Sequence, residues 1–95
     1  MNAQAPEQSI VLTIVNALGL HARSAAKVAA ICGKAQRRVW VRKDGETVDA
    51  SSIIDLLSLG CPQGTQIEVV IEHEQDRPVL EEIAALVRSG FGESP

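Results

Sequence analysis

One histidine stands where a predicted helix begins, and an arginine follows it two positions later. His21 precedes an alanine-rich helical pattern over residues 22–33, and Arg23 lies in the first turn. The first N–H groups of a helix have no partner within it, and the helix dipole adds positive potential there. The backbones of Ala22, Arg23 and Ser24 therefore predict an anion site. The same potential disfavours the charged ring, so a neutral His21 can attack phosphorus while Arg23 binds the phosphoryl oxygens.

The same residues have other interpretations. His21 can simply cap the helix, and Arg23 can be a solvated surface charge. Lys27, one turn further on, can attract phosphate or an acidic partner surface, or can be an ordinary surface lysine. A small hydrolase of the acylphosphatase kind would also use a phosphate-binding arginine, but it needs a group that positions water. Apart from glutamines, Asn16 is the only such amide outside the N-terminal segment.

Hydrophobic patterns predict the elements that carry these side chains. Alternation of apolar and polar residues predicts strands at 9–15, 37–43, 46–49 and 65–73. Helical spacing and terminating residues predict helices at 22–33, 52–59 and 76–89. The order β-α-β-β-α-β-α predicts an α+β open-faced sandwich, in which a four-stranded antiparallel sheet has all three helices on one face. We expect residues 1–8 to form a frayed extension, residues 9–91 one domain, and residues 92–95 a flexible tail.

Several local signals refine these boundaries. Lys43-Asp44-Gly45 predicts a hairpin turn, and Asp76 is expected to cap the third helix. If alternate valines of the second strand face the core, Trp40 lies on the other sheet face between two arginines, where a cation–π contact is expected. Ser52 with an aspartate three residues later is similar to a capping box.

Composition excludes several classes of function. The 95 residues are 45% hydrophobic and 22% charged, which is typical of one small globular domain. The aromatic content of 2% and the net charge of −3 disfavour nucleic-acid binding, although residues 1–50 carry an excess of basic residues. Cys32 and Cys61 lack metal-ligand spacing, so we expect small buried thiols and neither metal nor cofactor. Without an export signal or an apolar span, we expect a cytoplasmic protein. We also expect it to be a monomer.

Two motifs together resemble a known family. The first is Gly19-Leu20-His21-Ala22-Arg23, followed by Ser24-Ala25-Ala26, and the second is SIIDLLSLG at residues 52–60. They resemble the active-site motif and the second-helix motif of the HPr phosphocarrier proteins of the bacterial phosphoenolpyruvate-dependent phosphotransferase system. The resemblance runs from about residue 10 to residue 87 and implies the HPr-like open-faced sandwich.

The resemblance also implies a chemical role. His21 would accept a phosphoryl group on Nδ1 from phosphorylated enzyme I and pass it to a histidine of an enzyme II A component, with Arg23 binding the group. The protein would then be a carrier with a phosphohistidine intermediate and not a stand-alone catalyst, serving sugar uptake or its regulation. A regulatory docking module in nitrogen-type or carbon-catabolite signalling is the alternative. Ser24 replaces the proline usual in the family, and its hydroxyl is a further candidate to reach the phosphoryl group.

The second motif carries the remaining expectations. Ser52 is expected to cap its helix, and the resemblance implies that it is also the target of a serine kinase and phosphorylase. The resemblance assigns partner docking to apolar residues beside the histidine, for each of which core packing is the alternative: Leu20, Ile53, Ile54 and Leu57. His73 lies among acidic residues that oppose an incoming phosphate, so we expect an ordinary surface histidine.

Overall fold

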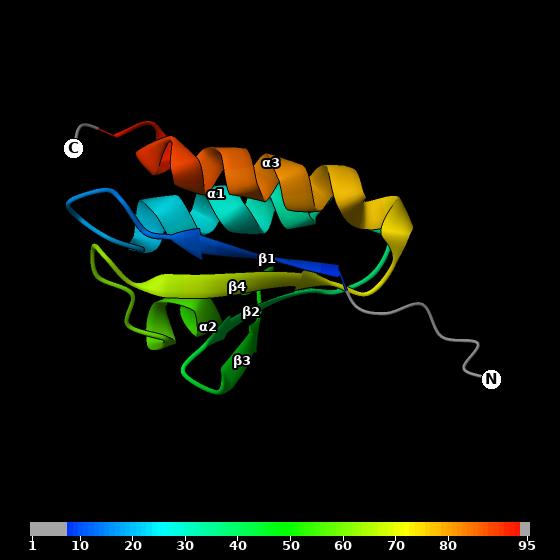
Figure 1. The fold of residues 1–95 in the computed structure, drawn as a ribbon, viewed down its shortest axis with the longest axis horizontal. Coiled ribbons are helices and arrows are strands. Elements are labelled where there is room, and N and C mark those ends of the chain that lie inside the picture. Colours follow the sequence, from blue (N-terminus) through cyan, green and yellow to red (C-terminus); the bar gives the residue numbers. More distant parts are fainter. Residues whose placement is uncertain (1–7, 94–95) are drawn as a thin grey trace.

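The computed structural model describes residues 8–93 (Figure 1). In chain order the elements are β1 (Gln8–Thr13), α1 (Ala22–Cys32), β2 (Val39–Lys43), β3 (Glu46–Asp49), α2 (Ile53–Ser58), β4 (Gln66–Ile71) and α3 (Arg77–Arg88). Short 3-10 turns at Glu74–Asp76 and Gly90–Gly92 flank α3. Gln8, which the sequence assigned to the N-terminal extension, begins β1. The rest of the predicted extension (1–7) and half of the predicted tail (94–95) lie outside the described residues.

The four strands form one sheet in the order β1-β4-β2-β3, and every neighbouring pair is antiparallel. The helices α1 and α3 lie side by side along the sheet, while α2 packs beside α1 and contacts β3 (Figure 1). The predicted α+β open-faced sandwich is therefore confirmed. Because β4 pairs with both β1 and β2, it is the central strand that brings the first and second halves of the chain together.

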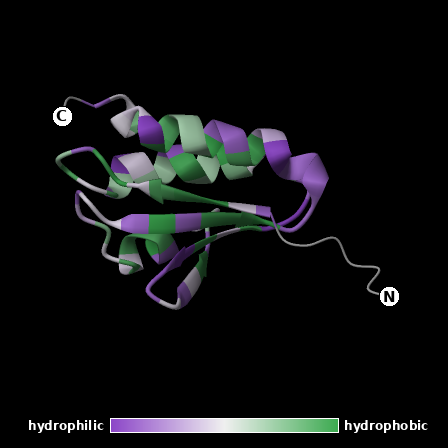
Figure 2. Cartoon of the chain, in the orientation of Figure 1, coloured by the Kyte–Doolittle hydropathy of each residue, from purple (hydrophilic) through white to green (hydrophobic). Residues whose placement is uncertain are grey.

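The core lies between the sheet and the helices. Figure 2 shows hydrophilic and hydrophobic residues alternating at the start of β4, whereas its second half is hydrophobic throughout and Val69, Val70 and Ile71 are all buried. The inward residues of the strands meet helical residues at the spacing of one helix face. Fully or almost fully buried members of this core are Leu12, Val41, Val69, Ile71, Ala25, Val28, Leu56, Leu80, Ile83 and Val87.

Two local predictions about β2 and its hairpin are confirmed. Asp44 and Gly45 both have positive φ, at 51° and 83°, which matches the type I′ turn that joins tightly twisted strands. Trp40 lies on the sheet face away from the core, and the Arg38 guanidinium carbon is 5.8 Å from its ring centroid. The indole N–H of Trp40 also donates to Glu72, just after the neighbouring strand β4, at 2.8 Å.

The predicted helix caps differ from the observed ones. Asp76 occupies the N-cap position of α3, but its buried carboxylate accepts from the backbone N–H groups of Gln36 and Arg37 at 2.7 and 2.9 Å. It therefore ties α3 to the chain entering β2 and does not cap its own helix. Ser52 does cap α2, accepting from the N–H of Asp55 at 3.2 Å. No reciprocal bond from Asp55 completes the capping box, because aspartate is shorter than the glutamate or glutamine of that motif.

The two cysteines are free and buried, as predicted. Burial, with the nearby charge of Asp49, raises the pKa of the Cys32 thiol to about 11, and burial also raises the pKa of Cys61. Both thiols are therefore unreactive near neutral pH. Across residues 8–93, the structure has no helix with the length and apolar character needed to cross a bilayer.

Candidate functional site

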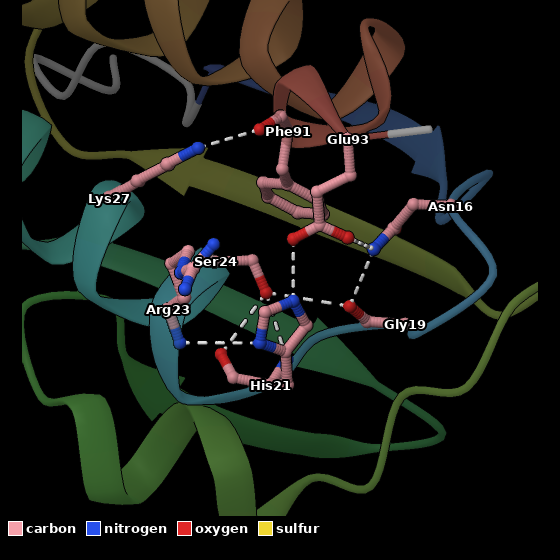
Figure 3. Close-up of polar contacts among 8 residues, drawn as sticks. All are labelled: Asn16, Gly19, His21, Arg23, Ser24, Lys27, Phe91 and Glu93. Atoms are coloured by element: carbon pink, nitrogen blue, oxygen red, sulfur yellow. Dashed lines mark hydrogen bonds and ion pairs between the residues drawn. The ribbon is translucent and has the colours of Figure 1, made fainter. Parts of the chain in front are cut away.

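His21 is the N-cap residue of α1 (Figure 3). Its extended backbone (φ −123°, ψ −176°) lets its side chain turn back over the helix end, where Nδ1 accepts a hydrogen bond from the N–H of Arg23 at 3.3 Å. Its own N–H donates to the Ser24 hydroxyl at 2.8 Å, which completes a capping box. One ring nitrogen is thus fixed at the positive end of α1.

The loop before His21 is shaped by Gly19, whose φ is +68°. A Cβ at this position would lie 2.5 Å from the carbonyl oxygen of Cys61 and 2.8 Å from Cα of Pro62. The neighbouring N–H of Leu20 donates to that same Cys61 oxygen at 2.8 Å. Only glycine allows this close approach, which holds the loop against the segment between α2 and β4.

The groups that could bind an oxyanion are accessible. The His21 side chain is 29% exposed, and Ala22 and Arg23 are exposed as well. Within residues 8–93, no carboxylate or carbonyl pairs with the Arg23 guanidinium. The first-turn N–H groups of α1 lack carbonyl partners four residues back in the helix, so they favour negative charge here. The arrangement can accept a tetrahedral anion at Nδ1.

The hydroxyl of Ser24 is buried against the loop before α1. It contacts the backbone carbonyls of Gly19 and His21 at 3.4 and 3.1 Å while accepting from the N–H of His21. The hydroxyl is therefore engaged within the loop, and its reach to a phosphoryl group stays a prediction. It braces the first turn in the place where the resemblance has proline.

A residue far away in the sequence completes the surroundings of the ring. Glu93, assigned from the sequence to the flexible tail, has one carboxylate oxygen 2.5 Å from His21 Nε2 (Figure 3). The other oxygen accepts from the buried Asn16 amide at 2.9 Å, and the same amide donates to Gly19 O at 2.8 Å. These hydrogen bonds, first from Asn16 and then from His21, lower the pKa of Glu93. The sequence carried no signal for this contact, because 72 positions separate the two residues.

Lys27 is tied to the C-terminal segment, by which we mean residues 90–93. Its Nζ donates to the carbonyl oxygen of Phe91 at 2.7 Å, and the Phe91 ring is buried in the core. The lysine is therefore not a plain solvated charge. It fastens the segment that carries Glu93 to the surface of α1, and its positive charge lies near the same carboxylate.

The predicted docking residues divide into two groups. Ile54 is 77% exposed, and Ile53 and Leu57 are each 39% exposed, so α2 presents apolar surface to solvent. Leu20 is partly buried against the core, which favours its structural interpretation. Leu18 was not predicted, yet it is 71% exposed in the loop before His21. The apolar patch (Leu18, Ile53, Ile54 and Leu57) joins this loop and α2, and α2 packs beside α1.

The second histidine has similar local geometry in a different setting. His73 is the N-cap of the first 3-10 turn, and its Nδ1 accepts from the N–H of Gln75 at 3.0 Å. The residue is exposed and neighbours Glu72 and Glu74, as expected for a surface histidine. A three-residue turn and acidic neighbours provide no anion site.

Residues 8–89 match the family model described as "PTS HPr component phosphorylation site". The chain belongs to the HPr family. Among curated relatives, the phosphocarrier protein HPr of Pseudomonas aeruginosa is 35% identical over 86 residues, covering 90% of this chain and 96% of the relative. That of Cupriavidus necator is 32% identical over 81 residues, covering 85% and 91%. Membership in the HPr family implies interaction with enzymes of the phosphotransferase system.

Solved HPr structures share the fold. A crystal structure of HPr from Thermoanaerobacter tengcongensis has a TM-score of 0.86 and 33% identity, covering 93% of this chain and 99% of that one. The HPr of Bacillus anthracis has a TM-score of 0.79 and 30% identity, with coverage of 90% and 99%. The similarity therefore extends over the whole folded part of the chain.

Proposed function

We propose that this HPr family member is a phosphocarrier that accepts a phosphoryl group on His21 from phosphorylated enzyme I and passes it to a histidine of an enzyme II A component. The proposal rests on one observation: Nδ1 of an accessible histidine lies at the N-terminus of α1, 3.3 Å from the Arg23 backbone nitrogen. The exposed Arg23 guanidinium is available on the same turn. Proposed site residues are therefore His21 and Arg23, with the N–H groups of Ala22 and Ser24.

The chemistry divides between carrier and partners. The Nδ1 lone pair is the nucleophile, while the helix N–H groups and Arg23 are placed to stabilise the phosphoryl oxygens. The ring is 29% exposed, so a docked partner can provide the rest of the transition-state environment. A carrier exchanging its group with two cytoplasmic partners in turn fits this open site.

We further propose that the apolar patch docks these partners and that Ser52 regulates docking. Exposed aliphatic residues beside a reactive group are typical of an interface centre. Ser52 lies at the start of α2, directly before two members of the patch, Ile53 and Ile54. A phosphate there would add about −1.5 to −2 charges beside the apolar surface. It would suit a helix N-terminus yet oppose contact with an acidic partner.

Phosphoryl transfer from phosphoenolpyruvate tests the function directly. Purified protein is incubated with enzyme I and labelled phosphoenolpyruvate, and acid-labile, base-stable label on the protein is measured. We expect label on the wild type and on His73→Ala, and none on His21→Ala. His73→Ala is the matched control because it removes the other ring, which also accepts a backbone N–H. Label persisting on His21→Ala refutes the assignment, and an unlabelled wild type favours the regulatory docking module.

A further inference from the structure

The carboxylate of Glu93 is held on both oxygens. Oε1 accepts from Asn16 Nδ2 at 2.9 Å, and Oε2 lies 2.5 Å from His21 Nε2. The Glu93 side chain is only 15% exposed, and Lys27 anchors the preceding turn through Phe91 O. The proposed function gives this arrangement no task, because it uses the opposite nitrogen of the ring.

Asn16 is committed to orienting the carboxylate. The residue is 1% exposed, and its amide nitrogen donates to two acceptors, Gly19 O and Glu93 Oε1. Its Oδ1 is buried without a hydrogen-bond partner among the described residues. Reversing the amide would turn that oxygen toward two other oxygens, so the observed orientation is the favourable one.

The two neighbours of the His21 ring specify one tautomer. A neutral imidazole has one N–H and one lone pair. The N–H of Arg23 requires a lone pair on Nδ1, while the Glu93 carboxylate requires a proton on Nε2. The opposite tautomer would turn one N–H toward another and a lone pair toward a carboxylate. Both contacts are therefore satisfied only with the proton on Nε2.

We propose that Glu93, oriented by Asn16, is a positioning residue that keeps the proton of His21 on Nε2 and thereby directs phosphorylation to Nδ1. This inference rests on the proposed phosphocarrier function and assigns part of its control to the C-terminal segment. In serine proteases a carboxylate acts on the catalytic histidine in the same manner. It fixes the tautomer of the ring and stabilises the positive charge that the ring gains.

The transfer step balances with this assignment. The Nδ1 lone pair forms the nitrogen–phosphorus bond while the bond from phosphorus to the donor histidine of enzyme I breaks, and that histidine keeps the electron pair. The proton of Nε2 stays on the ring, which becomes positively charged, and the adjacent Glu93 carboxylate offsets that charge. Transfer to the enzyme II A histidine reverses these changes and restores the neutral ring.

Glu93→Gln tests the proposal because glutamine keeps the size of the side chain and removes its charge. A glutamine amide can accept from Nε2–H or donate to a bare Nε2, so residue 93 no longer selects a tautomer, and only the Arg23 N–H, 3.3 Å from Nδ1, still favours the proton on Nε2. The matched control is Glu82→Gln, which removes a carboxylate paired with Lys34 at 2.7 Å on the exposed side of α3. Tautomers are read from ¹⁵N–¹H NMR correlations of the His21 ring at pH values where it is neutral.

We expect the wild type and Glu82→Gln to carry the proton on Nε2, and Glu93→Gln to show a mixture of tautomers. Phosphorylation by enzyme I should slow by about tenfold in Glu93→Gln and remain unchanged in Glu82→Gln. A wild-type proton on Nδ1, or an unchanged tautomer and rate in Glu93→Gln, overturns the role of Glu93. A wild type that takes no label while its proton lies on Nε2 refutes the phosphocarrier function instead, so the two failures are distinguishable.

Discussion

Replacing Gly19 by alanine tests whether the loop that places His21 depends on close backbone contact. Gly19 and Gly60 have almost the same positive φ, +68° and +67°, so alanine is strained equally at both positions. The added Cβ meets nothing within 4 Å at Gly60, but at Gly19 it lies 2.5 Å from the carbonyl oxygen of Cys61. Gly60→Ala is therefore the matched control for conformational strain alone.

The difference in cost follows from these contacts. Alanine in the left-handed region costs about 1 to 2 kcal/mol at either site. At Gly19 the clash is with backbone atoms, so the loop must move away from Cys61 and break the 2.8 Å hydrogen bond from Leu20. Forced overpacking adds about 1 to 3 kcal/mol, and the lost hydrogen bond about 1 kcal/mol. We expect the unfolding free energy of Gly19→Ala to be lowered by about 3 to 6 kcal/mol.

Urea unfolding followed by far-ultraviolet circular dichroism measures both free energies by linear extrapolation. The rate of phosphorylation by enzyme I, measured without urea so that both variants are folded, reports whether the His21 ring is still correctly placed. Gly19→Ala should also transfer more slowly, whereas Gly60→Ala should match the wild type. If Gly19→Ala and Gly60→Ala lower the unfolding free energy by amounts that agree within about 0.5 kcal/mol, the reasoning is refuted, because the steric contact with Cys61 would then cost nothing.

Four further predictions concern the carboxylate of Asp76, the thiol of Cys32, the pH dependence of stability that this thiol causes, and the apolar patch. Asp76→Asn should lower the unfolding free energy by about 1 to 3 kcal/mol, because one amide oxygen cannot replace the two carboxylate oxygens that accept backbone N–H groups. The control Asp55→Asn, at an exposed position, should change it little. Both free energies are measured by urea unfolding. Near pH 9, Cys32 should be alkylated about 50-fold more slowly in native than in urea-unfolded protein, because its pKa is about 11 and not 9.0. Equal rates would contradict its burial. The same difference should make stability fall as pH rises from about 9 to 11, because the unfolded thiol ionises first. Ile54→Gln should weaken enzyme I binding at least several-fold by calorimetry, while Val11→Gln, equally polar but on the open sheet face, should not.

Much of the fold was predictable because its signals are local. The polar–apolar alternation at the start of β4, from Gln66 to Val69, and the positive-φ turn at Asp44 and Gly45 depend on neighbours along the chain. The predicted strand ended too late, at residue 73, because the chain after Ile71 turns into the first 3-10 turn, where His73 supplies the cap. The end of a strand depends on which groups the fold provides as partners for its last hydrogen bonds. A hydrophobic pattern does not encode those partners.

The sequence by itself determined that His21 and Arg23 share the first turn of a helix, since helix starts follow from adjacent residue types. Only the tertiary structure decided what surrounds the ring. Glu93 reaches Nε2 because α3 lies beside α1 and ends near its N-terminus, and Lys27 and Phe91 fasten that end. The physical reason is range: propensities act over a few residues, whereas a contact across 72 positions exists only once the sheet and helices have packed.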